Sequence, residues 1–289
     1  MGYILQIGLP IIIIILAPFA GGIVLGADSF ISSRMKGIGK ISPFQPFTDV
    51  KKLLKKQTSE EDKGKFPFIF GHFIFSLISL ALLIFRQDIL FIVMMNLLSW
   101  IFLLMYGFFS SKTSERLASK RGLYMILSCF PVLYAFGGSI YILTGGYTVG
   151  DVINFSGNLL FKIPFIFIAV IMVIMIRSGK PPFDTSVSDS PINLKTTGGL
   201  IEGLYGRQLA AVQITGWINT FIMYAIIGLF YIKTLWVAVL IAAAVFLLQC
   251  FLSNIFPKLK NQYIYRIIPA VLFGVSMLNI LWIALKEYM

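Results

Sequence analysis

Residues 177–207 read RSGKPPFDTSVSDSPINLKTTGGLIEGLYGR and form the longest polar break in the second half of an otherwise apolar chain. The stretch holds three prolines and five glycines, and Pro181 and Pro182 prevent the preceding apolar segment from continuing as a helix. Its backbone groups could not stay unpaired in lipid without a large cost in free energy. The stretch therefore connects two membrane-spanning segments outside the bilayer, and we interpret it as the surface where the protein meets a partner.

The overall composition excludes a water-soluble globular protein. Of the 289 residues, 58% are hydrophobic and only 12% are charged, whereas soluble proteins carry about 25% charged residues. The net charge of +12 does not indicate a nucleic-acid partner, because the cations cluster between apolar segments instead of forming a stripe with interleaved aromatic residues. We expect a lipid membrane as partner and no nucleic acid.

Cysteine and histidine are too sparse for a cofactor site in this chain. Cys129 and Cys250 both lie in apolar segments, His72 is the only histidine, and the sequence contains no CxxC pattern. Iron–sulfur clusters, haem and zinc need clusters of such ligands. We predict no cofactor, no metal and no catalytic residue here, and interpret the cysteines as packing residues and His72 as an interfacial hydrogen-bonding group.

Eight apolar segments are long enough to cross a bilayer, which takes about 20 residues. They cover roughly residues 3–27, 66–85, 88–110, 122–146, 161–177, 208–232, 234–256 and 267–286. The fifth is the shortest, and we expect Lys162 and Arg177 to reach from its two ends toward the headgroups. The predicted fold is an all-α integral membrane protein with about eight transmembrane helices, in a single polytopic domain over residues 1–289.

Lysine and arginine set the predicted orientation. The connections that follow odd-numbered segments contain 20 of the 24 cationic residues, and these connections are 28–65, 111–121, 177–207 and 257–266. By the positive-inside rule they face the cytoplasm, and both termini lie outside. The sequence thus predicts a multi-pass protein of the cell (plasma or inner) membrane.

The first of these connections has a helical pattern of its own. Pro46 suits the first turn of a helix, Asp49 its N-terminal half and the lysines of 51–56 its C-terminal end. Four apolar residues fall on one face: Phe47, Val50, Leu53 and Leu54. We predict an amphipathic helix lying on the membrane surface. It serves either as a basic headgroup anchor alone or as part of a docking surface.

None of the twelve acidic residues falls in the middle of a predicted span. Ion and proton pathways through a bilayer usually contain ionisable side chains at that depth. The polar residues inside the spans are uncharged, and they include Asn96, Ser99, Ser128, Ser139, Thr215, Asn219 and Gln249. We therefore expect these side chains to join helices and expect no pump channel within this chain.

Two loop motifs resemble those of a known family. Residues 180–184 (KPPFD), followed by 199–203 (GLIEG), resemble the "[RK]-x-P-F-D … E-L-V-x-G" signature of the quinone-chamber subunit (subunit 1, or H) of respiratory complex I. A counterpart of that protein occurs in membrane-bound, energy-converting NiFe hydrogenases of the Ech and formate-hydrogenlyase kind. Residues 34–37 (RMKG) and 45–53 (QPFTDVKKL) resemble the first loop of the same family.

The chain departs from the family pattern at several acidic positions. Family acids correspond here to Gly199, to Arg177 and to a position near Arg207, and the glutamate before the span-four proline is missing around residues 128–131. Arg34, Asp49, Lys180 and Asp184 match the pattern, and Glu202 lies in the correct loop but off register. In complex I such acids are implicated in coupling quinone chemistry to proton movement, so the departures favour a hydrogenase-type complex.

The resemblance implies a non-catalytic membrane-anchor and energy-coupling subunit of a ferredoxin-linked, ion-translocating NiFe hydrogenase complex. Its expected partners are hydrogenase-like large and small soluble subunits, an iron–sulfur subunit and antiporter-like membrane subunits, with the NiFe centre and iron–sulfur clusters in those partners. The residues expected to dock the soluble arm and couple it are Arg34, Gln45, Asp49, Lys180, Asp184, Asp189, Glu202 and Arg207. A quinone-chamber subunit of a complex I-type oxidoreductase is the alternative, and an independent secondary transporter is a third hypothesis.

Overall fold

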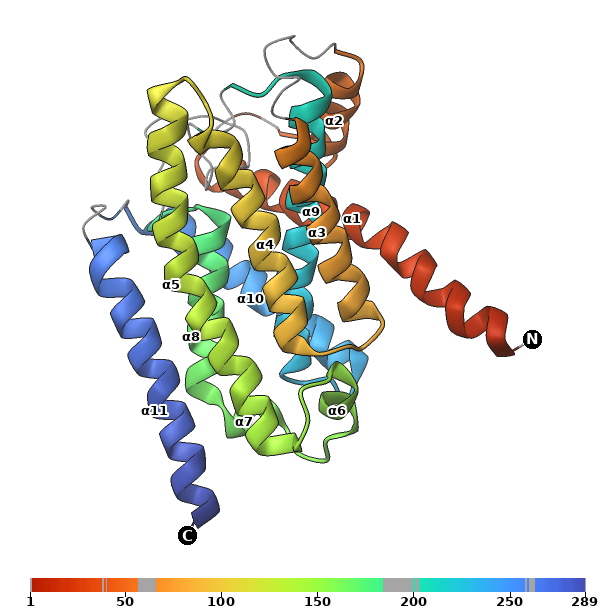
Figure 1. Cartoon of the computed structure of the whole chain (residues 1–289), viewed down its shortest axis with the longest axis vertical. Helices are drawn as coiled ribbons and strands as arrows, with labels where there is room; N and C mark the ends of the chain where they lie inside the picture. Colours follow the sequence, from red (N-terminus) through yellow and green to blue (C-terminus); the bar gives the residue numbers. More distant parts are fainter. Residues whose placement is uncertain are drawn as a thin grey trace.

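The structure is a computed structural model that describes residues 2–37, 39, 41–56, 66–183, 200, 203–257, 259 and 263–288. The described residues form a bundle of helices (Figure 1). In chain order the helices are α1 (Gly2–Met35), α2 (Gln45–Leu54), α3 (Phe66–Ile84), α4 (Ile89–Phe108), α5 (Thr113–Thr144), α6 (Val149–Asn154), α7 (Leu159–Lys162), α8 (Pro164–Ser178), α9 (Gly206–Leu229), α10 (Leu235–Ile255), a π-helical turn (Tyr263–Ile267) and α11 (Ile268–Tyr288).

The prediction of an all-helical membrane protein is confirmed. Within the described ranges, seven helices are long and apolar enough to cross a membrane: α1, α3, α4, α5, α9, α10 and α11. The predicted fifth span is built from α7 and the shorter apolar helix α8. The two are separated at Ile163 because Pro164 occupies the first turn of α8 and starts a new helix.

Two helices extend well beyond their predicted spans. α1 runs to Met35 instead of residue 27, and α5 begins at Thr113 instead of residue 122. Hydropathy marks the edge of the lipid, whereas a helix continues as long as its backbone stays hydrogen-bonded, so polar residues can prolong it past the membrane. As a result Asp28 and Glu115, which the sequence placed in connecting loops, are helical residues with 4% and 1% exposure.

α9 lies at the centre of the arrangement and packs against α1, α2, α3 and α10. α5, α8 and α11 pack together on the other flank, and the first half of α1 projects away from the bundle (Figure 1). The α9 group and the α5–α8–α11 group meet around Phe230, at the end of α9. The Phe230 ring stacks on that of Phe136 at 4.8 Å and meets the edge of the Phe167 ring at 5.0 Å, both measured between ring centroids. The large apolar side chains that remain exposed are those of a bundle that faces lipid.

The amphipathic helix predicted in the first connection is present as α2. Pro46 stands in its first turn, Val50 is buried and the lysines of its last turn are exposed. α2 rests against α9 and α1 through Phe47, whose ring lies 4.9 Å from the Trp217 ring and 6.2 Å from that of Phe19. The helix is therefore fixed to the bundle by its apolar face.

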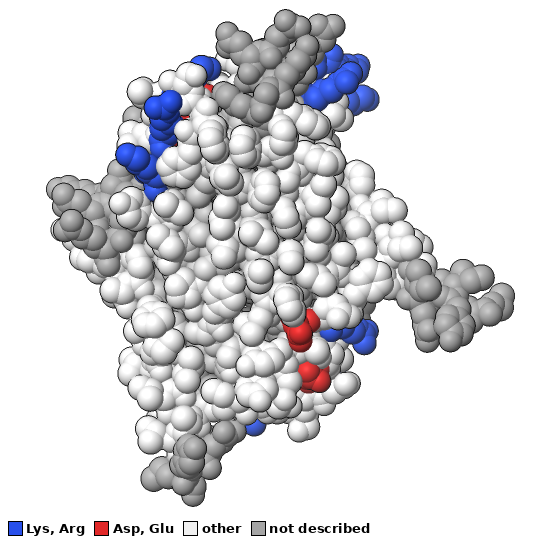
Figure 2. Space-filling model, in the orientation of Figure 1, with Lys and Arg blue, Asp and Glu red and all other residues white. Residues whose placement is uncertain are grey.

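Cationic side chains gather at one end of the bundle. α1, α4, α8 and α10 finish at this end, which is uppermost in Figure 1, and we call it the basic end. Figure 2 shows Lys and Arg side chains in two groups there, and the lower part of the same face shows acidic side chains together with further Lys or Arg side chains. The exposed lysines of α2 and of the first turns of α5 belong to these groups.

Candidate functional site

Two neighbouring cavities lie between α1 and α9 at the basic end, and Leu25 and Gly216 line both of them. The Arg177 cavity has a volume of about 80 Å³ and is also bounded by α4, α8 and α10. The Trp217 cavity has a volume of about 420 Å³ and is also bounded by α2. The two cavities contain the polar groups that a functional site requires.

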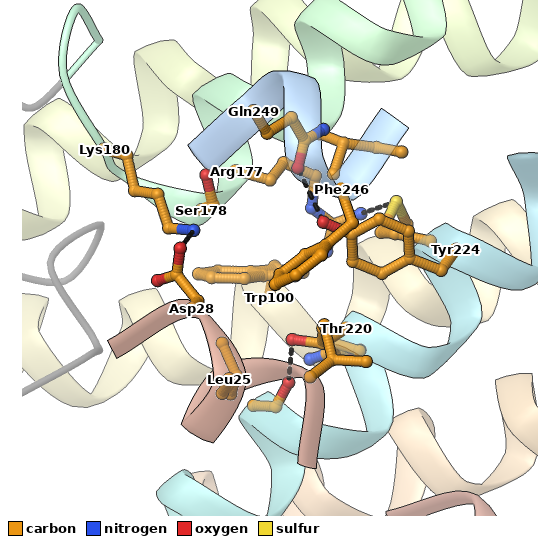
Figure 3. Close-up of a pocket in the computed structure, with 15 residues that line it drawn as sticks. Leu25, Asp28, Trp100, Arg177, Ser178, Lys180, Thr220, Tyr224, Phe246 and Gln249 are labelled. Atoms are coloured by element: carbon orange, nitrogen blue, oxygen red, sulfur yellow. Dashed lines mark hydrogen bonds and ion pairs between the residues drawn. The ribbon is translucent and has the colours of Figure 1, made fainter. Parts of the chain in front are cut away.

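Lys180 and Asp28 form an ion pair on the wall of the Arg177 cavity (Figure 3). The Lys180 Nζ atom lies 2.6 Å from Asp28 Oδ1, and the two side chains are 16% and 6% exposed. α8 ends at Gly179, whose left-handed φ of +59° takes the chain out of the helix just before Lys180. Lys180, near the start of the 177–207 connection, is thereby joined to α1.

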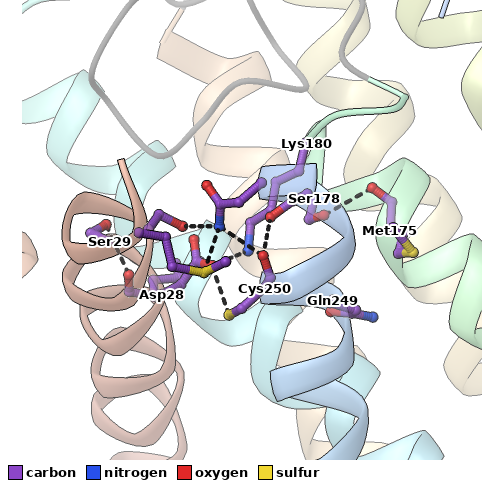
Figure 4. A network of polar contacts seen from close by, with 12 residues as sticks. Asp28, Ser29, Met175, Ser178, Lys180, Gln249 and Cys250 are labelled. Atoms are coloured by element: carbon purple, nitrogen blue, oxygen red, sulfur yellow. Dashed lines mark hydrogen bonds and ion pairs between the residues drawn. The ribbon is translucent and has the colours of Figure 1, made fainter. Parts of the chain in front are cut away.

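The same aspartate also contacts α10 (Figure 4). Cys250 Sγ donates a hydrogen bond to Asp28 Oδ1 at 3.2 Å. One turn further along, Asn254 Nδ2 donates to Ser32 Oγ at 3.2 Å and to the Cys250 carbonyl at 2.7 Å. Asp28 is therefore the point at which α1, α10 and the start of the long connection meet.

Arg177 turns into the bundle, so the expectation that it extends toward the headgroups is wrong. Its Nη1 donates to Asn96 Oδ1 at 2.6 Å and approaches Met223 Sδ at 3.7 Å. The guanidinium carbon lies 5.1 Å from the Trp100 ring centroid and 5.8 Å from that of Phe130. Aromatic faces and an amide acceptor on neighbouring helices give the cation a better environment than the short helix end does.

A chain of uncharged polar groups continues from Arg177 through the bundle. Asn96 Nδ2 donates to Asn219 Oδ1 at 2.7 Å, and Ser76 Oγ donates to the same oxygen at 3.0 Å. Close by, His72 Nδ1 lies 2.8 Å from both the hydroxyl and the carbonyl oxygen of Ser99. These contacts connect α3, α4, α8 and α9, which is the role that the sequence predicted for the polar residues inside the spans.

Two of the predicted docking residues, Gln45 and Asp49, line the Trp217 cavity. Asp49 is half-buried on the side of α2 that faces α1 and α9, and the Trp217 and Leu53 side chains close the apolar part of the wall. The cavity thus combines an aromatic surface with a carboxylate and an amide. Such a combination suits an amphipathic ligand or the side chains of a docked protein.

The remaining predicted residues lie apart from these cavities or outside the described residues. Arg34 is exposed at the end of α1, 5.3 Å from the Phe30 ring, and Arg207 is exposed in the first turn of α9. Asp184, Asp189 and Glu202 lie outside the described residues. The structure therefore brings together Gln45 with Asp49, and places Lys180 beside them in the adjoining cavity.

Sequence reasoning did not select Asp28, Arg177, Asn219 or Gln249, which form much of the Arg177 cavity. Asp28 closes the first apolar segment and Arg177 closes the fifth, so each looks like an ordinary residue of a helix end. The amides and hydroxyls within the spans did indicate that polar contacts join the helices. This pattern does not determine which helices meet, because that depends on packing.

Comparisons with known proteins identify the family. Residues 7–284 match the sequence profile of the family described as NADH dehydrogenase. A search of curated proteins gave no match. Among solved structures, the fold is similar to a chain of the membrane-bound sulfane sulfur reductase, an archaeal respiratory membrane complex, with 17% sequence identity, a TM-score of 0.82 and coverage of 95% of this chain and 98% of that one.

The region that matches the family profile contains every helix that forms the two cavities. The similarity in fold to the sulfane sulfur reductase chain extends over nearly the whole chain. This agreement also accounts for the loop motifs at residues 34–53 and 180–203. The chain belongs to the NADH dehydrogenase family of membrane proteins and is a membrane component of a complex I-related respiratory or energy-converting complex.

Proposed function

We propose that this chain is the anchor and energy-coupling subunit of a ferredoxin-linked, ion-translocating membrane-bound NiFe hydrogenase complex. In this proposal the basic end faces the cytoplasm and binds the soluble subunits that carry the nickel site and the nearest iron–sulfur cluster. The observation that carries the coupling role is the Lys180–Asp28 ion pair, because it joins the start of the 177–207 connection to the membrane helices. No redox chemistry takes place in this chain.

The proposed docking surface combines α2 with the neighbouring helix ends. α2 presents exposed lysines and rests on the bundle through Phe47, so its position relative to α1 and α9 is set by packing. Exposed cations accelerate association with acidic partners and orient them, while buried aromatic and apolar contacts supply most of the affinity. Asp49, at the rim of the Trp217 cavity, is the carboxylate of this surface best placed to select a cationic partner residue.

The proposed relay begins at the end of α8, where Lys180 and Arg177 are three residues apart. Lys180 contacts α1 through Asp28, and Asp28 contacts α10 through Cys250. Arg177 contacts α4 through Asn96, and Asn96 contacts α9 through Asn219. A displacement of the connection by a docked subunit would therefore change polar contacts on four neighbouring helices. These helices would pass the change to antiporter-like subunits in the membrane.

The choice of a hydrogenase rests on the residues that replace family acids. Arg177, Gly199 and the segment 128–131 lack the carboxylates that accompany quinone coupling in complex I. The similarity in fold to a chain of a complex named for sulfane sulfur reduction also supports an acceptor other than quinone. A soluble hydrogenase module, which delivers electrons to protons, would not require those carboxylates.

One observation favours the quinone-chamber alternative. The Trp217 cavity, at about 420 Å³, falls within the range of about 300–1,000 Å³ that is typical of small-molecule sites. Trp217 offers a flat apolar surface there, and Gln45 and Asp49 offer polar groups for a ring carbonyl. Under this alternative the purified complex would reduce quinone, and Trp217→Ala would abolish that activity while leaving electron entry intact.

Identification of the subunits that purify with this chain tests the proposal. We expect a nickel-containing large subunit, iron–sulfur subunits and antiporter-like membrane subunits, together with hydrogen evolution driven by reduced ferredoxin. Flavin-bearing subunits and quinone-dependent activity would decide for the complex I alternative. Recovery of the chain without soluble subunits, together with ion uptake by the reconstituted chain, would revive the secondary transporter and refute the anchoring role.

A further inference from the structure

Three nitrogen donors on the wall of the Arg177 cavity lack a hydrogen-bond partner in the part of the chain that the structure describes. They are Arg177 Nη2, Asn219 Nδ2 and Gln249 Nε2, and all three atoms are buried. A buried donor without an acceptor destabilises the fold, and more strongly when it is charged. Three such donors on one small cavity indicate that an acceptor belongs inside it.

The side-chain oxygens of Asn219 and Gln249 already accept hydrogen bonds within the bundle. Asn219 Oδ1 accepts from Ser76 and Asn96, and Gln249 Oε1 accepts from the Tyr224 hydroxyl at 2.6 Å. Both residues are nearly inaccessible, with 5% and 1% exposure. The NH₂ groups are therefore the part of each amide left to bind a group in the cavity. Figure 3 shows Gln249 and Arg177 on the same side of this space.

The charge of the cavity is also unbalanced. Among the residues that line it, Arg177 and Lys180 are cationic and Asp28 is anionic, and Asp28 is paired with Lys180. The partners that the structure gives Arg177 are an amide oxygen, a thioether and two aromatic rings, none of which carries a formal negative charge. An uncompensated cation inside a membrane protein is costly, and it normally pairs with an anion.

Geometry narrows the class of anion. The guanidinium is held by the rings of Trp100 and Phe130 and by Asn96 on Nη1, so the Nη2 edge has a fixed orientation. Planar, forked donors of this kind match the two oxygens of a carboxylate. The cavity volume of about 80 Å³ exceeds the roughly 10–15 Å³ that a single water requires on this measure, so a carboxylate group fits inside.

We propose that the Arg177 cavity binds a carboxylate, with Arg177, Asn219 and Gln249 as its donors. The carboxylate comes from outside the described residues, and the two sources tested are a small free acid and an Asp or Glu side chain of a neighbouring subunit. Both sources present the same two oxygens to the same donors, and the experiments below distinguish them. The inference depends on the cavity alone, so its failure would leave the hydrogenase proposal untouched.

Equilibrium dialysis of the purified intact complex against radiolabelled formate tests the free-acid source. We expect about one formate bound per complex, with binding weakened about tenfold or more in Gln249→Met, which removes one charge-assisted hydrogen bond at nearly constant side-chain size. Gln213→Met is the matched control, because Gln213 is a buried glutamine of the adjoining Trp217 cavity. It should bind formate as the wild type does.

An electron cryo-microscopy map of the same complex tests the second source. Side-chain density that reaches the Arg177 guanidinium from a neighbouring subunit, together with the absence of formate binding, would support the proposal with a protein carboxylate as the ligand. In that case Gln249→Met should loosen that subunit during size-exclusion chromatography, whereas Gln213→Met should not. A map with only water in the cavity, and dialysis that detects no formate in the wild type, would overturn the proposal.

Discussion

At the scale of single residues, the site depends on where a few charges are buried. Asp28 lies where α1, α10 and the start of the long connection meet, and its ion pair with Lys180 is largely shielded from water. Arg177 is held by aromatic rings and an amide. Buried charges are costly unless they are paired, so replacing a partner of one of these residues should destabilise the fold more than replacing the partner of an exposed charge.

A double-mutant cycle on the ion pair tests this constraint. We expect Asp28→Asn and Lys180→Met each to lower the stability of the purified complex by about 1–3 kcal/mol, because each leaves a buried charge without its partner. The double variant should be closer to wild type than the sum of the two losses. The measurement is the thermal unfolding midpoint in detergent, with Asp88→Asn at the opposite end as control. Strictly additive effects would mean that the pair has no energetic coupling.

Residue-level features were the least predictable from sequence. The acidic and basic residues at helix ends were visible, but Arg177 was expected to point to the headgroups and instead contacts Asn96. The choice between these directions depends on what α4 presents to α8, which is a property of helix packing and not of local sequence. By contrast Asn219 could be predicted to join helices, because an amide within a span has few other partners.

At the scale of elements, the apolar pattern predicted most of the helices and their order. α2 could be located from Pro46 and its apolar face, and α8 corresponds to the shortest of the predicted apolar segments. The ends of α1 and α5 were missed, since hydropathy reports lipid contact and these helices continue beyond it. The same extension carries Asp28 and Glu115 into the helical bundle, and through Asp28 the length of α1 affects the composition of the Arg177 cavity.

The attachment of α2 can be tested by limited proteolysis. Phe47→Ala removes the ring that lies between Phe19 and Trp217, and we expect trypsin to cleave after the lysines of α2 about five- to tenfold faster. Phe44→Ala is the matched control, since that ring is 64% exposed and lies 6.4 Å from Phe47. Equal cleavage of both variants would show that the Phe47 contact does not hold the helix.

The close approach of α1 to α9 can be tested with a single methyl group. A Cβ at Gly21 would overlap the backbone oxygen of Trp217, so Gly21→Ala must push α1 away from the wall that both cavities share. We expect a loss of about 1–3 kcal/mol, as for other overpacked contacts. In Gly8→Ala the new methyl group meets open space, and stability should not fall. A thermal midpoint in Gly21→Ala equal to that of wild type would contradict the packing described.

At the scale of the whole molecule, the helical membrane fold and the family could be predicted from the sequence. The motifs at 34–53 and 180–203 indicated the family, and the family profile and the fold agree with it. The docking role of the eight predicted residues is still a prediction, because it concerns subunits that contact the chain from outside. Gln45 and Asp49 line one cavity at the basic end, and Lys180 lines the adjoining one.

The contribution of Asp49 to docking can be measured directly. We expect Asp49→Ala to release soluble subunits from the complex and to reduce hydrogen-linked activity by about three- to tenfold per membrane subunit, as loss of a selective interface charge would. Asp88→Ala, at the opposite end of the bundle, should retain both. Full activity and a complete set of soluble subunits in Asp49→Ala would remove Asp49 from the docking surface.

Photocrosslinking in intact membranes tests whether the basic end binds a soluble electron-transfer module. A photoreactive p-benzoylphenylalanine introduced at Gln45, on α2, is compared with one introduced at Arg86, which is exposed at the other end of the bundle. We expect crosslinks from position 45 to a soluble subunit that carries nickel or iron–sulfur clusters, and none from position 86. Crosslinks to such a subunit from position 86 alone, or from neither position, would contradict this expectation.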